Sequence, residues 1–97
     1  MSSKRKGSPS PRRRTTVIQD ECMEDFEHWV RTDRKVALRV LPLMKETRRD
    51  PFRGIGKPEP LKHLGPDVWS RRITAQDRLV SRVTDVSVHF LQARYHY

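Results

Sequence analysis

The sequence predicts an α+β domain in which a short N-terminal strand and two helices pack on an antiparallel sheet. Apolar residues recur at helical spacing between residues 20 and 49, strand-like runs fill residues 68–95, and short turn segments separate those runs. Helices followed by consecutive strands are typical of α+β folds rather than of alternating α/β folds. The chain has 97 residues, which is enough for one small domain with a modest core.

The first elements are predicted to be a strand and a helix. Residues 15–18 form a β-prone run, and Asp20 follows as a plausible helix cap. Three apolar residues are then spaced as one buried helical face, namely Met23, Phe26 and Val30.

A second helix is predicted to begin at the cap formed by Thr32 and Asp33 and to end in the basic residues 45–49. Its apolar residues form two neighbouring stripes, one of Val36, Val40 and Leu43 and one of Ala37, Leu41 and Met44. Pro42 lies inside this helix and should kink it, because proline removes a backbone donor.

The second half of the chain is predicted to be a Gly- and Pro-rich loop followed by a meander of strands. The loop covers residues 51–66, with one short strand around Leu61. Strand-like runs follow at 68–73, 78–84 and 86–95, and the segments between them are short enough for hairpins.

Hairpin pairing predicts which distant residues meet, because paired residue numbers in an antiparallel hairpin have a constant sum. A turn near 75/76 places Arg72 close to Leu79 and Arg78, and a turn near Asp85 places Arg78 opposite about Gln92. One end of the sheet should therefore gather Arg72, Arg78 and residues 92–97.

The charge of the chain points to a phosphate-bearing or acidic partner. Lys and Arg total 21 against 12 Asp and Glu, a net charge of +9. Residues 1–14 carry six of the positive charges, no acid and one apolar residue, so we expect a disordered basic tail ahead of a domain at 15–97. The domain alone is only mildly basic, at +3.

Several classes of protein are disfavoured by composition. One cysteine, Cys22, excludes an internal disulfide and gives no support for a zinc site, so we expect no metal or other cofactor. No stretch is long and apolar enough for a membrane span, and the basic start lacks the apolar block of a secretory signal. The expected compartment is the cytoplasm.

The loop that carries Glu59 leads into the first of these strands from the same general region. Together these residues offer a carboxylate, an imidazole, a phenol and several guanidiniums. These groups suffice to cleave RNA, in which a base activates the ribose 2′-OH, a cation stabilises the phosphate charge and an acid protonates the leaving 5′-oxygen. DNA lacks the 2′-OH and does not react by this route.

The chain resembles the YoeB toxins, in the Txe/YoeB branch of the RelE superfamily, over roughly residues 15–97. The motifs that carry the resemblance are Lys-Pro-Glu-Pro-Leu-Lys-His at 57–63, Trp-Ser-Arg-Arg-Ile-Thr at 69–74, Arg-Leu-Val at 78–80 and Arg-Tyr-His-Tyr at 94–97. The resemblance implies a RelE-like fold and a ribosome-dependent, metal-independent messenger RNA endonuclease that cuts in the decoding site. It also implies inhibition by a YefM-like antitoxin and a homodimeric state.

The resemblance also implies roles for single residues. Glu59 takes the role of general base, His96 that of general acid, and Arg78 stabilises the charge of the transition state. Tyr97 shapes the site, while Lys62 and Arg72 hold phosphates.

Three other interpretations fit parts of the sequence. A non-catalytic RNA-binding protein, or a protein-binding module of RelE-like fold, would also be basic, but a pure RNA binder has no use for Glu59 beside phosphate. A degenerate toxin would retain only the surface that binds an antitoxin. Arg71 and Arg82 are interpreted as general electrostatics, and Trp69 as a core residue or a neighbour of an RNA base.

Overall fold

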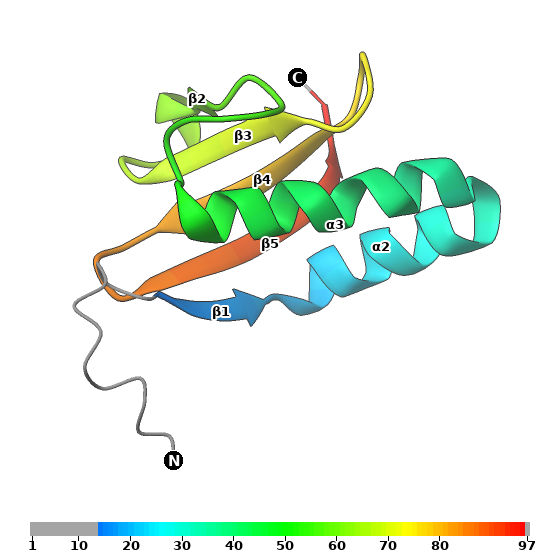
Figure 1. Cartoon of the computed structure of the whole chain (residues 1–97), viewed down its shortest axis with the longest axis horizontal. Helices are drawn as coiled ribbons and strands as arrows, with labels where there is room; N and C mark the ends of the chain where they lie inside the picture. Colours follow the sequence, from blue (N-terminus) through cyan, green and yellow to red (C-terminus); the bar gives the residue numbers. More distant parts are fainter. Residues whose placement is uncertain (1–13, 97) are drawn as a thin grey trace.

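Two helices lie across one face of a five-stranded sheet in the computed structural model, which describes residues 14–96 (Figure 1). In chain order the elements are β1 Thr15–Ile18, α2 Asp20–Thr32, α3 Arg34–Arg49, β2 Glu59–Pro60, the 3₁₀ helix η1 Lys62–Leu64, β3 Val68–Arg72, β4 Arg78–Val83 and β5 Ser87–Tyr95. The predicted α+β class is confirmed. Residues 1–13 of the predicted tail, and Tyr97, lie outside the described residues.

The sheet is mixed rather than wholly antiparallel, with the strand order β1-β5-β4-β3-β2. β3, β4 and β5 form the predicted antiparallel meander, β2 extends it at one edge, and β1 adds to β5 in parallel at the other. Arg14, which was assigned to the tail, donates a hydrogen bond from Nε to the carbonyl oxygen of Thr84 at 2.7 Å. The chain is therefore held to the β4–β5 turn just before β1 begins.

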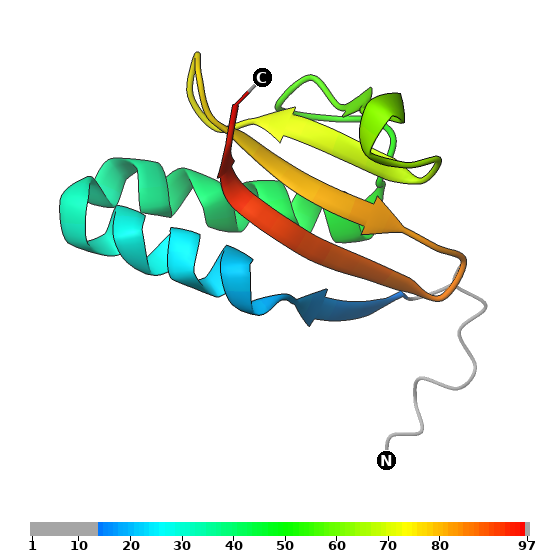
Figure 2. The ribbon, with the colours of Figure 1, turned by 180° about the vertical axis from the view of Figure 1, so that it is seen from behind.

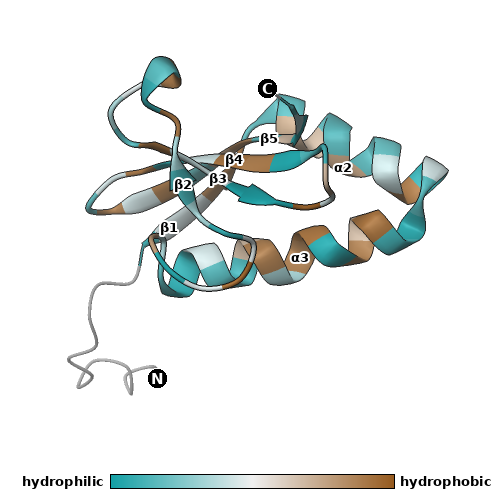
Figure 3. Ribbon diagram, turned by 90° about the horizontal axis from the view of Figure 1, so that it is seen from above, coloured by the Kyte–Doolittle hydropathy of each residue, from teal (hydrophilic) through white to brown (hydrophobic). Residues whose placement is uncertain are grey.

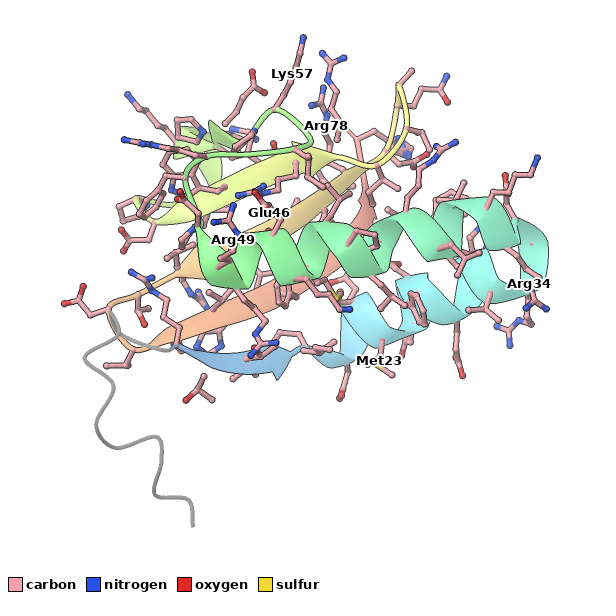
Figure 4. The ribbon with its side chains drawn as sticks, in the orientation of Figure 1. Met23, Arg34, Glu46, Arg49, Lys57 and Arg78 are labelled. Carbon is pink, nitrogen blue, oxygen red and sulfur yellow. The ribbon has the colours of Figure 1, made fainter. Side chains whose placement is uncertain are left out.

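The buried face of α2 differs from the predicted one. Met23 and Val30 are 47% and 43% exposed, and Figure 4 shows Met23 on the side of α2 away from α3. The residues that face the core are instead Cys22, Phe26 and Trp29, of which Cys22 is fully buried. Burial raises the pKa of the Cys22 thiol to about 12, with smaller contributions from the nearby carboxylates of Asp25 and Glu21.

α3 packs against the sheet through most of the predicted apolar residues. Its buried residues are Val36, Ala37, Val40, Leu43, Met44 and Thr47. Leu41, which was predicted to lie on one of the stripes, is 44% exposed. The helix continues through Pro42, and Leu38, whose carbonyl would have received the missing hydrogen bond, is 65% exposed. Water can therefore solvate that carbonyl.

The core is divided between the two faces of the sheet. The larger cluster joins both helices to Ile73, Leu79, Val88 and Phe90, and brown, hydrophobic residues accordingly occur on α3 and along the central strands in Figure 3. A smaller cluster of Leu61, Val68 and Val80, with Leu91 and Tyr95 against it, lies on the other face. That second face is not covered by the helices, as Figure 2 shows from behind.

One of the two predicted pairings at the end of the sheet is confirmed and the other is wrong. Arg72 lies opposite Arg78, as the turn near 75/76 required. Arg78, however, lies opposite Tyr95 and not opposite Gln92, which pairs with Val80. The register shifts twice along the β4–β5 ladder, and each shift places one extra residue on β5, as a β-bulge does.

No helix within residues 14–96 combines the length and the apolar character needed to cross a membrane.

Candidate active site on the open face of the sheet

Two of the predicted catalytic residues, Glu59 and Arg78, lie on the sheet face that the helices leave open. Residues paired directly across neighbouring strands present their side chains on the same face. Glu59 lies opposite Ser70, and Arg78 lies between Arg72 on β3 and Tyr95 on β5. Because Ser70 and Arg72 are two residues apart on one strand, all five side chains share this face.

Arg78 is the central residue of this group. Its side chain is only 10% exposed, and its Nη1 lies 3.9 Å from Oε1 of Glu59, whose side chain is 54% exposed. A guanidinium held in this way keeps its positive charge next to a carboxylate that solvent or a ligand can reach.

A pocket of about 520 Å³ adjoins Arg78 at the end of the sheet. It is lined by three residues of the β3–β4 turn, by Arg78 and by His96. The turn residues are Ala75, Gln76 and Asp77. Nε2 of His96 lies 3.8 Å from Oδ1 of Asp77. Arg78 therefore contacts Glu59 on one side and lines the pocket of His96 on the other.

Asp77 is held firmly by the turn in which it lies. Its Oδ2 accepts a hydrogen bond from Oγ1 of Thr74 at 3.0 Å, and its own backbone N–H donates to the same Oγ1 at 2.9 Å. The other carboxylate oxygen is the one that faces His96. Sequence analysis treated residues 74–77 as a simple turn, although a Thr three residues before an Asp is a signal for such bonding.

The two predicted phosphate-binding residues are both exposed and both lie near this face. Arg72 is opposite Arg78, and its backbone N–H donates to the carbonyl oxygen of Gly56 at 2.7 Å. Lys62 opens the turn η1, two residues after the end of β2. Figure 4 shows Lys57 at the same end of the sheet as Arg78, which adds a further positive charge there.

Arg71 is a structural residue, not the general electrostatic residue that was predicted. It is 2% exposed and donates to three carbonyl oxygens of the loop after α3, those of Asp50 at 2.6 Å, Arg53 at 2.8 Å and Ile55 at 2.9 Å. Burial lowers the pKa of this guanidinium. The loop that Arg71 holds leads directly into Lys57, Pro58 and Glu59.

The same loop is shaped by two further features of the backbone. Gly56 has a φ of +84°, and a Cβ placed there would lie 2.8 Å from Cδ2 of Leu43 and 3.0 Å from Cβ of Arg71. A residue other than Gly is therefore excluded by both conformation and space. Lys57 has a φ of 52°, in the left-handed region that side chains rarely adopt.

Glu46, in the last turn of α3, is paired with Arg49. Nη2 of Arg49 donates to Oε2 of Glu46 at 2.8 Å, and Figure 4 shows both residues beneath the loop. This hydrogen bond is the main reason why the pKa of Glu46 is lowered and that of Arg49 is raised. Glu46 is thus paired within α3.

His63 and Tyr95 form a contact that sequence analysis did not predict. Nε2 of His63 and the hydroxyl of Tyr95 are joined by a hydrogen bond of 3.1 Å. The bond ties the turn η1 to the end of β5, across the strands that carry Arg72 and Arg78. No sequence signal joined residues 63 and 95, because the bulges in β5 set which of its residues reaches this point.

Trp69 lies on the other side of the sheet from Glu59. It neighbours Ser70 on β3, so its side chain points to the opposite face. There the centre of its ring lies 4.9 Å from the centre of the Phe52 ring. Trp69 therefore supports the loop after α3 and does not flank the candidate site.

The arrangement places a carboxylate beside a buried guanidinium, and an imidazole on the wall of the pocket that this guanidinium lines. A carboxylate can take a proton, an imidazolium can return one, and a buried guanidinium can stabilise negative charge between them. Within residues 14–96 there is no group of three or more His, Cys, Asp or Glu side chains placed to hold a metal ion.

Comparisons with known proteins agree on one family. A family model described as the YoeB-like toxin of bacterial type II toxin-antitoxin systems matches residues 18–97. Toxin YoeB from Escherichia coli K12 is 49% identical over 81 residues, which cover 84% of this chain and 96% of that protein.

Solved structures give the same result. The YoeB dimer from Staphylococcus aureus superposes with a TM-score of 0.79 at 32% identity, and the match covers 88% of this chain and 99% of that one. A heterotetrameric YoeB-YefM toxin-antitoxin complex from the same organism contains a chain that matches with a TM-score of 0.74 at 33% identity, with the same coverage.

Proposed function

Because the chain belongs to the YoeB-like toxins of bacterial type II toxin-antitoxin systems, we propose that it is a ribosome-dependent, metal-independent endoribonuclease. In this proposal it cleaves messenger RNA in the decoding site and so inhibits translation in the cytoplasm. The observation that carries the proposal is the position of Arg78, 3.9 Å from Glu59 and on the wall of the pocket that His96 lines.

The reaction follows from the roles of these three side chains. Glu59 accepts the proton of the ribose 2′-OH, and the oxygen attacks the adjacent phosphorus. Arg78 stabilises the negative charge that builds up on the phosphoryl oxygens. The bond from phosphorus to the 5′-oxygen breaks, and His96 donates its proton to that oxygen, which leaves a 2′,3′-cyclic phosphate or the 3′-phosphate derived from it.

The remaining predicted residues complete the proposed site. Arg72 and Lys62 bind the flanking phosphates, and Tyr97, which follows His96, shapes the site beside the scissile bond. The exposure of Arg72 and Lys62 supports this assignment, since a polyanion can reach both side chains.

We also propose a YefM-like antitoxin and a second copy of the chain as partners. The Staphylococcus aureus relatives form a YoeB dimer and a YoeB-YefM complex, and the chain matches nearly their full length. An acidic segment of the antitoxin would neutralise the cluster of Arg72 and Arg78 and so compete with RNA. Co-purification with a co-expressed antitoxin, and sedimentation of the free protein, test these two partners.

The chemical test is cleavage of ribosome-bound messenger RNA with identification of the ends. Attack by the 2′-OH leaves a cyclic phosphate or 3′-phosphate and a free 5′-OH, and a single 2′-deoxyribose at the cut position abolishes it. Replacing Glu59 or His96 by Ala should lower turnover by about a hundred-fold or more. Arg82→Ala, at an exposed position toward the other end of β4 from Arg78, should have little effect. A product with a 5′-phosphate, or full activity of both alanine variants, would refute the mechanism.

A further inference from the structure

The end of β5 is held by two side chains of α2. Oδ2 of Asp25 accepts a hydrogen bond from the backbone N–H of Ala93 at 2.8 Å, and Nε1 of Trp29 donates to the carbonyl oxygen of the same residue at 2.8 Å. Both backbone groups of Ala93 are therefore bonded to one helix. Asp25 and Trp29 are four residues apart and lie on one side of α2.

These bonds replace a strand that is missing at this point. β1 pairs with β5 only as far as Ile18 and Phe90, and Gln19 adds one last backbone bond to Phe90. Ala93 lies beyond that point and within the second register shift, where the register gives it no one-to-one partner on β4. Since Ala93 is fully buried, its N–H and C=O would lose water without gaining a partner if α2 did not supply one.

A third contact joins the next residue to the same helix. The guanidinium carbon of Arg94 lies 5.9 Å from the centre of the Trp29 ring, which is within the range of a cation–π interaction. Residues 93 and 94 are thus fixed to α2 by backbone and side chain. His96 follows two residues later, and its side chain is 61% exposed.

We propose that Asp25 and Trp29 are positioning residues that place His96 in its pocket by anchoring Ala93. This inference rests on the proposed function, because the acid role of His96 belongs to it. A bulged strand end is free to bend, and a residue with an exposed side chain is placed mainly by its backbone. The α2 contacts remove that freedom three residues before the imidazole that must meet the leaving oxygen.

The test compares four variants of the full chain on ribosome-bound messenger RNA. Asp25→Ala removes the acceptor, and Asp25→Asn keeps a side-chain oxygen in its place. Trp29→Phe removes the N–H donor and part of the ring system while keeping an aromatic ring beneath Arg94. Glu24→Ala, an exposed acid one position earlier on α2, is the matched control. Thermal unfolding of each variant identifies the temperature at which all are folded, and kinetics are measured there.

We expect Asp25→Ala to lower kcat by about ten- to a hundred-fold with KM within about two-fold, because the chemical step depends on placement and substrate binding does not. Asp25→Asn should recover kcat to within about three-fold of the parent, and Trp29→Phe should lower it by about ten-fold. Hydrogen exchange of the Ala93 amide should accelerate in Asp25→Ala and not in Glu24→Ala.

Two results overturn the positioning role alone. One is an Asp25→Ala variant with an exchanging Ala93 amide and the same kcat as Glu24→Ala. The other is an Asp25→Asn variant as slow as Asp25→Ala, which would assign the effect to the charge of Asp25 rather than to its hydrogen bond. If His96→Ala cleaves as fast as the parent protein, the proposed function fails and the positioning role fails with it, while the Ala93 amide still reports whether the anchor exists.

Discussion

Arg71 offers a direct measure of how much one buried side chain stabilises the loop that carries Glu59. Its guanidinium is 2% exposed and donates to three carbonyl oxygens at 2.6 to 2.9 Å. Hydrogen bonds from a charged donor contribute about 1.5–3 kcal/mol each. Two effects make the loss of stability in Arg71→Ala smaller than the sum of three such bonds. Water can solvate the carbonyls of the exposed residues Arg53 and Ile55, and the cost of burying the guanidinium disappears.

We therefore expect Arg71→Ala to lower the free energy of unfolding by about 2–4 kcal/mol, a large part of the stability of a small domain. Urea unfolding followed by tryptophan fluorescence measures the change, at one fixed protein concentration because association alters apparent stability. Arg82→Ala is the control: Arg82 is exposed on β4, and its loss should stay within about 0.5 kcal/mol. Equal midpoints and slopes for the two variants would refute the role given to Arg71.

Three further predictions address other parts of the chain. The Cys22 thiol should resist thiol reagents at pH 8 until the protein unfolds. The free energy of unfolding should fall above about pH 9, by up to about 1.4 kcal/mol per pH unit, because the unfolded thiol loses its proton while the folded thiol, with its pKa of about 12, keeps it. The same pH titration of Cys22→Ala should lack this fall. Pro42→Ala should raise the free energy of unfolding by about 1–3 kcal/mol, since it restores a helical N–H at an exposed position, and an unchanged urea midpoint would contradict this. Removing residues 1–13 should leave cleavage intact but reduce the salt dependence of ribosome affinity, because five positive charges are lost; an unchanged salt slope would show that the tail makes no phosphate contacts.

The order and type of the elements could be predicted because each rests on a local pattern. Helical spacing identified α2 and α3, and turn residues separated the strands of the meander. The buried face of α2 could not be chosen in the same way. Met23, Phe26 and Val30 are spaced as well as Cys22, Phe26 and Trp29 are, and only packing against β5 decides between the two sets.

The candidate site shows the same division. The resemblance to a toxin family named Glu59, Arg78 and His96. The fold places Glu59 beside Arg78, and it places His96 on the wall of the pocket that Arg78 also lines. Arg71 was missed because its role depends on carbonyl oxygens sixteen to twenty-one residues away, which no periodicity reports. An Arg beside Arg72 on a strand carries the same sequence signal whether it points to solvent or into a loop.

The two bulges in β5 explain why His96 reaches Asp77 at all. Near the β4–β5 turn the paired numbers sum to 171, as in Val83 with Val88, but at the far end Arg78 and Tyr95 sum to 173. Continuing the first register would place Asp77 opposite residue 94, and continuing the second places it opposite residue 96. The observed distance of 3.8 Å between His96 and Asp77 agrees with the second register. Beyond the end of β1, the N–H and C=O of Ala93 are bonded by Asp25 and Trp29 in place of a neighbouring strand. The two bulges therefore move His96 by two residues along the ladder, to the position opposite Asp77. The contacts from α2 hold the end of the strand that carries it.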